Sequence, residues 1–125
     1  GYFVTPTLVD NLPAEHNLWQ QEMFVPITTL AKVKNLDEAM TRANNVAYGL
    51  AAGVYGSDEE VEWFFDKIEA GVTYANRPQG ATTGAWPGIQ AFGGWKSSGS
   101  TGKAIGSYYT MPLYGREQSR TIIIG

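Results

Sequence analysis

The middle of the chain alternates short β-branched runs with two helix patterns, and this alternation limits the possible folds more than any other feature. Ile27 to Val33, Leu50 to Tyr55 and Val72 to Asn76 are short apolar runs typical of buried strands. Two amphipathic segments separate them, so the order reads strand, helix, strand, helix, strand. This order predicts an α/β fold in which right-handed crossovers build a mostly parallel sheet covered on both faces.

Both predicted helices carry a start signal. Asn35 can cap the first helix, and Glu38 can return a hydrogen bond from its first turn. Apolar residues then mark one helix face as far as Tyr48-Gly49. The second helix begins with SDEE at residues 57–60, a full capping box, and we expect Gly71 to end it.

The C-terminal part of the chain has a different character. Glycine is dense from Arg77 to Gly106, which predicts ordered loops at the strand ends, where open α/β sheets bind ligands. Ser119 to Ile124 is a flat apolar run that predicts a strand used in oligomer assembly, or alternatively an edge strand of the same domain. We therefore divide the chain into a main part, residues 1–112, and a terminal segment, residues 113–125.

Composition excludes several classes of function. With 125 residues, 43% hydrophobic and 17% charged, the chain suits one globular domain, and no apolar run approaches the roughly 20 residues that a membrane span needs. A net charge of −3 with scattered basic residues offers no patch for a phosphate backbone, so we expect no nucleic-acid partner. The chain has no cysteine and one histidine, and we therefore expect no metal site.

Two familiar catalytic motifs are incomplete. Gly99 to Lys103 resembles the end of a P-loop, but Ala104 stands where Ser or Thr would hold magnesium, and no G-x-G-x-x-G occurs. His16 lies in the polar stretch PAEHN, where a solvated side chain is a better interpretation than a member of a serine triad.

Five ordered segments resemble the C-terminal part of aldehyde dehydrogenases: GYFVTPTLVD, QEMFVPI, ANNVAYGLAAGVY, AGVTYAN and FGGWKSSGS. The resemblance covers essentially the whole chain. Within the family, TTGAWPGIQAFGGWKSSGSTGK followed by REQSRT is most similar to the 1-pyrroline-5-carboxylate dehydrogenase branch. That branch oxidises L-glutamate γ-semialdehyde to glutamate in proline catabolism, with NAD (or NADP) as the cofactor.

The resemblance implies a cofactor-binding role for two residues. The glutamate of the family's E-x-F motif accepts hydrogen bonds from the nicotinamide ribose, and the aromatic residue packs against the same ribose; these positions match Glu22 and Phe24. Without the resemblance, Glu22 would be interpreted as a cap or an exposed helix end, with Phe24 in the core. The family usually has glycine where Val25 stands, so this turn has to place a β-branched residue at negative φ.

The resemblance also implies substrate binding by the glycine-rich loop. Backbone N–H groups that match Gly84 and Ala85 would hold the substrate α-carboxylate, and Phe92 matches the aromatic wall of the aldehyde tunnel. From the residues alone, an ordinary tight turn is the simpler interpretation of residues 83–85. A family proline is replaced by Ala91, which makes the predicted loop less rigid.

The family's cysteine nucleophile and base glutamate lie N-terminal to the matched region, so we expect no catalytic residue in this chain. The chain is predicted to contribute ribose and substrate contacts to a larger NAD(P)-dependent enzyme that acts on a small-molecule aldehyde. We expect a cytoplasmic homo-oligomer (mitochondrial matrix if eukaryotic), assembled through the C-terminal strand. The alternative is a free-standing, non-catalytic α/β module that binds a nucleotide or a protein partner.

Overall fold

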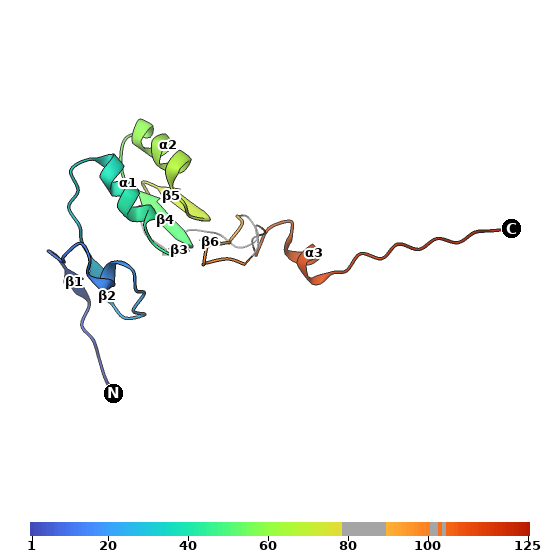
Figure 1. Ribbon diagram of the computed structural model, residues 1–125, viewed down its shortest axis with the longest axis horizontal. Helices are drawn as coiled ribbons and strands as arrows, with labels where there is room; N and C mark the ends of the chain where they lie inside the picture. The colour runs from blue at the N-terminus through green and yellow to red at the C-terminus, as the bar shows by residue number, and fades with distance from the viewer. Residues whose placement is uncertain (79–89, 101–102, 104) are drawn as a thin grey trace.

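The computed structural model describes residues 1–78, 90–100, 103 and 105–125. Its elements are β1 (Thr7–Val9), the short helix η1 (Asn17–Trp19), β2 (Ile27–Thr29), α1 (Leu36–Asn44), β3 (Tyr48–Gly49), β4 (Ala51–Val54), α2 (Asp58–Lys67), β5 (Val72–Ala75), β6 (Trp95–Lys96) and α3 (Thr110–Tyr114). Helices α1 and α2 lie with β4 and β5 in a central unit (Figure 1). The β1–β2 pair lies on one side of this unit, and the C-terminal segment runs away from it (Figure 1).

In the described part of the chain, the strands form three two-stranded sheets. β4 and β5 pair in parallel, with Ala51 opposite Val72, and α2 is the crossover between them, as predicted. β2 pairs in parallel with β1, and β3 pairs antiparallel with β6. The α/β character is confirmed, but the prediction that β2, β4 and β5 share one sheet is wrong. Local periodicity identifies a strand without identifying its partner, and β2 finds that partner upstream.

Helix α1 begins at the predicted cap. The Asn35 side chain accepts a hydrogen bond from the Glu38 N–H at 2.9 Å, while the Glu38 carboxylate accepts from the Lys34 N–H at 2.9 Å and from Arg42 at 2.7 Å. The bond from the Lys34 backbone, followed by that from Arg42, lowers the pKa of Glu38. The helix ends at Asn44, earlier than predicted, because Tyr48–Gly49 pairs as β3.

Helix α2 carries the predicted capping box. The Ser57 hydroxyl accepts from the Glu60 N–H at 3.4 Å, and the Glu60 carboxylate accepts from the Ser57 N–H at 2.8 Å. The helix ends at Lys67 with Ile68 as its C-cap, so the prediction that Gly71 ends the helix is wrong. Gly71 instead immediately precedes β5.

Ser57→Ala is expected to lower the free energy of unfolding by about 1 kcal/mol, because the Glu60 N–H loses its capping acceptor. Urea unfolding followed by circular dichroism measures this change. Ser119→Ala is the control, since Ser119 is exposed in the C-terminal segment. Equal unfolding midpoints for the two variants would contradict a stabilising cap.

The buried core is small for a chain of this length. Among the described residues, five hydrophobic side chains are buried, at 6–9% exposure: Met40, Phe64, Ile68, Ala70 and Val72. The accessible surface is 10427 Å², whereas a folded monomer of this mass exposes about 6,600 Å². Large hydrophobic side chains are exposed at both ends of the chain, such as Phe3 at 96% and Ile123 at 91%. An apolar surface of this extent is typical of a face that packs against other protein.

The C-terminal segment runs as an extended chain away from the central unit (Figure 1). Residues 119–124 make no strand pairing among the described residues, so the structure shows no edge strand here within this chain. Pairing with another subunit stays a prediction. The boundary that we placed between residues 112 and 113 falls inside α3. Among the described residues, no helix has the length and apolar character to cross a membrane.

Candidate functional site

The segment that carries Glu22 is held at both ends. On the N-terminal side, the Trp19 indole donates to the Pro13 carbonyl at 2.8 Å, and the Gln20 side chain donates to the Asn45 carbonyl at 2.6 Å. On the C-terminal side, the Pro26 carbonyl accepts from the Thr7 N–H at 2.8 Å, where β2 joins β1. The Gln20 bond reaches the end of α1, and the Pro26 bond reaches β1. The loop between Gln20 and Pro26 is therefore fixed to two parts of the fold.

His16 contributes to the same support. Its Nδ1 accepts a hydrogen bond from the Leu18 N–H at 3.1 Å, which makes it the N-cap of η1. The imidazole is exposed, in agreement with the sequence interpretation that His16 is not a triad histidine. Its capping role was not predicted, because a short 3₁₀ helix leaves little periodic signal.

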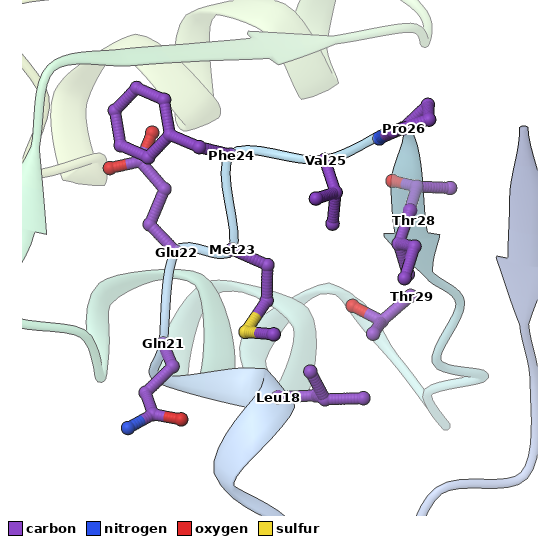
Figure 2. Close-up of a pocket in the computed structure, with 10 residues that line it drawn as sticks. Leu18, Gln21, Glu22, Met23, Phe24, Val25, Pro26, Thr28 and Thr29 are labelled. Atoms are coloured by element: carbon purple, nitrogen blue, oxygen red, sulfur yellow. The ribbon is translucent and has the colours of Figure 1, made fainter. Parts of the chain in front are cut away.

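Glu22 and Phe24 project from this loop. Their side chains extend toward the same side of the loop in Figure 2, whereas Met23 points the other way, toward Leu18. Phe24 has a positive φ of 49° and is 89% exposed, so the alternative that places Phe24 in the core is wrong. Val25 is not among the residues with positive φ, as its β-branched side chain requires.

The loop borders an open groove of about 490 Å³. The groove is lined by Leu18 and by residues 21–29, so it follows the loop into β2 (Figure 2). Glu22 also lines a second groove, of about 380 Å³, which includes Tyr48, Ile68 and Ser98. The Glu22 carboxylate therefore lies where the loop meets the central unit.

The chemistry of this arrangement is that of an acceptor beside an aromatic face. An ionised carboxylate offers two oxygens and no donor, so it suits a ligand with two adjacent hydroxyl groups. The exposed Phe24 ring can pack against the apolar face of the same ligand. No group of three or more His, Cys, Asp or Glu residues that could hold a metal ion occurs among residues with a described position.

The predicted substrate residues are only partly described. Gly84 and Ala85 lie outside the described residues. Phe92 is half-buried, and its N–H and carbonyl exchange hydrogen bonds with those of Ile105 at 2.9 and 3.0 Å. This reciprocal pair fixes the backbone of Phe92 and closes the loop between residues 92 and 105.

Sequence reasoning missed a group of polar residues that fastens this loop to the central unit. Lys96 contacts Glu69 at 2.6 Å and donates to the carbonyls of Asn44 at 2.5 Å and Val46 at 3.3 Å. We call Lys96, Glu69 and Asn44 the Lys96 cluster. The sequence did contain one signal, a lysine within the glycine- and serine-rich turn GGWKSSG. A lysine that is partly buried in such a turn needs an acceptor for its charge.

Comparison with known proteins identifies the class. Residues 1–115 match the model of the aldehyde dehydrogenase family, and the chain belongs to that family. It is 39% identical over 103 residues to 2,5-dioxopentanoate dehydrogenase of Saccharolobus solfataricus, covering 81% of this chain and 20% of that protein. It is 38% identical over 110 residues to 1-pyrroline-5-carboxylate dehydrogenase 2 of Bacillus subtilis, covering 87% and 21%.

Solved structures give the same result. The structure of 1-pyrroline-5-carboxylate dehydrogenase from Thermus with bound NAD superposes with a TM-score of 0.81 at 37% identity, covering 91% of this chain and 22% of that one. Betaine aldehyde dehydrogenase from Staphylococcus aureus gives a TM-score of 0.78 at 26% identity, covering 91% and 21%. The chain therefore spans about a fifth of the length of the relatives it matches.

Proposed function

We propose that this chain is the C-terminal part of the catalytic domain of an NAD(P)-dependent aldehyde dehydrogenase, and that the enzyme oxidises L-glutamate γ-semialdehyde to glutamate. The observation that carries the proposal is the anchored loop, which presents Glu22 and Phe24 on one side of an open groove (Figure 2). The enzyme works in the cytoplasm, as a homo-oligomer whose contacts include residues 113–125.

In this proposal, the Glu22 carboxylate accepts hydrogen bonds from the two hydroxyls of the nicotinamide ribose, and the Phe24 ring packs against that ribose. The bound cofactor supplies the hydride acceptor. The contribution of the chain is orientation, since the anchors at Gln20 and Pro26 limit the positions that the Glu22 carboxylate can reach.

The chain lacks the nucleophile that the family mechanism requires, because it contains no cysteine. We therefore expect no turnover from this chain alone. Its exposed apolar surface supports packing against the remainder of the same enzyme, which would also supply the nucleophile and the base. The same surface argues against the free-standing binding module.

Substrate selection is proposed for the glycine-rich loop. The backbone N–H groups of Gly84 and Ala85 would hold the substrate α-carboxylate, and Phe92 would form a wall of the aldehyde tunnel. The named relatives from Bacillus subtilis and Thermus support this substrate class. The paired backbone of Phe92 supports its role as a fixed wall.

The proposal is tested by measuring the rate of NADH formation by the complete enzyme with different aldehydes. Glutamate γ-semialdehyde is expected to give a kcat/KM at least roughly tenfold above that of butanal, because only the former offers a carboxylate to the loop. A kcat/KM that does not distinguish the two aldehydes would overturn the substrate assignment. An intact polypeptide near 13.6 kDa that forms no NADH would instead favour the binding module.

A further inference from the structure

The Lys96 ammonium group has three acceptors for its three donors. It contacts the Glu69 carboxylate at 2.6 Å and the carbonyls of Asn44 and Val46 at 2.5 and 3.3 Å. Only 23% of the Lys96 side-chain surface is exposed. The two carbonyls belong to the C-terminal end of α1 and to the residues just after it, where the helix dipole favours a cation.

Asn44 connects the same parts of the chain through its side chain. Its amide donates to the Lys67 carbonyl at 2.9 Å and accepts from the Glu69 N–H at 2.9 Å. The Lys96 cluster therefore joins three segments that are distant in sequence: the end of α1, the connection from α2 to β5, and the turn at residues 94–99. β6 lies beside β3, with which it pairs (Figure 1).

The turn around Lys96 is shaped to deliver its side chain to this position. Lys96 has a φ of 52°, a conformation that costs free energy for a residue with a Cβ and is kept only where the surroundings impose it. The Ser97 N–H donates to the Ala47 carbonyl, and the Ser98 hydroxyl accepts from the Gly49 N–H, both at 3.0 Å. Backbone and side chain thus dock the turn onto β3 and the residue just before it.

Phe92 lies at the base of the loop that contains this turn. Its pairing with Ile105 closes the loop, and the Lys96 cluster fastens the loop to the central unit. We infer that Lys96 is a positioning residue that sets where Phe92 stands relative to the aldehyde. This inference rests on the proposed function, because it assigns Phe92 to the aldehyde tunnel.

Lys96→Met in the complete enzyme tests the inference, since methionine keeps the apolar stem and removes the charge. The KM for the aldehyde is expected to rise on the order of tenfold. Glu69 and two carbonyls lose a charged donor, so the loop that carries Phe92 is no longer fastened in place. The KM for NAD+ should change by less than roughly twofold, because the Glu22 loop keeps its second anchor, the bond between the Pro26 carbonyl and the Thr7 N–H, which does not involve the Lys96 cluster. Hydrogen exchange of backbone amides in residues 92–99 should become faster on the order of tenfold.

Two further variants separate positioning from a loss of fold. Glu69→Gln keeps an acceptor for Lys96 and should raise the aldehyde KM less than Lys96→Met does. Lys32→Met removes an exposed lysine from the β2–α1 connection and should leave both KM values unchanged. An unchanged aldehyde KM in Lys96→Met would overturn the inference, and so would equal losses for aldehyde and NAD+ together with a lowered melting temperature.

The substrate proposal can fail without affecting this test. If the wild-type enzyme prefers an aldehyde other than glutamate γ-semialdehyde, the substrate assignment is wrong, and the KM comparison is made with the preferred aldehyde. The hydrogen-exchange measurement needs no substrate at all. Unchanged exchange in residues 92–99 of Lys96→Met would overturn the positioning role whichever aldehyde is used.

Discussion

Glu22→Gln in the complete enzyme is expected to lower kcat/KM roughly ten- to a hundredfold when NAD+ is varied. The substitution keeps one acceptor oxygen but removes the charge that would strengthen the proposed bonds from two ribose hydroxyls. Hydrogen bonds to charged groups contribute about 1.5–3 kcal/mol, which corresponds to this range. Because Glu22 is exposed on the loop and not part of the buried core, the melting temperature should stay the same.

The expected defect lies in orientation as well as affinity. A misplaced nicotinamide slows hydride transfer, so a deuterium-labelled aldehyde should show a larger isotope effect on kcat in Glu22→Gln than in the wild type. Glu62→Gln is the matched control, since it removes an exposed carboxylate from α2. Unchanged steady-state kinetics, with cofactor and aldehyde both varied, would show that Glu22 does not hold the ribose.

The local parts of the fold were predictable because their signals are contained in a few consecutive residues. The Asn35 cap and the Ser57 capping box place the starts of α1 and α2 correctly. The β4–α2–β5 unit also follows from the sequence, since a parallel pair needs a crossover of this kind. Each of these features depends on spacing within one segment.

The pairing of strands was less predictable. β2 has the composition of a buried parallel strand, yet its partner is β1, a run of three residues near the start of the chain. β3 and β6 have two residues each and carry almost no periodic signal. Their pairing depends on contacts made by the turn around Lys96, which are distant in sequence.

In the candidate site, the residue types could also be predicted from the sequence, whereas their placement in space could not. A carboxylate followed two residues later by an aromatic is visible in the sequence at Glu22 and Phe24, and the family resemblance gives the pattern a meaning. The positive φ of Phe24 and the anchors at Gln20 and Pro26 are not visible there. Tertiary hydrogen bonds create these features, so they could be found only in the structure.

Gly71→Ala is expected to have the largest effect on stability. Gly71 precedes β5, and its N–H donates to the Gly49 carbonyl at 3.0 Å. A Cβ added there would overlap the Gly93 carbonyl and would lie 3.2 Å from the Gly94 Cα. These atoms belong to the backbone, so no side-chain rotation can relieve the overlap, and β5 or the loop has to move. Overpacking of this kind costs about 1–3 kcal/mol, and we expect the upper end of that range.

The displacement caused by Gly71→Ala should also reach the substrate side, because Gly93 follows Phe92 directly. The variant is therefore expected to lower the melting temperature and to raise the KM for the aldehyde in the same protein. Gly115→Ala is the control: its added Cβ would lie 3.7 Å from the Pro112 carbonyl oxygen, an ordinary contact distance. If calorimetry gave the same melting temperature for both variants, Gly71 and Gly93 could not be in close backbone contact. A lowered melting temperature with an unchanged aldehyde KM would instead separate this contact from the placement of Phe92.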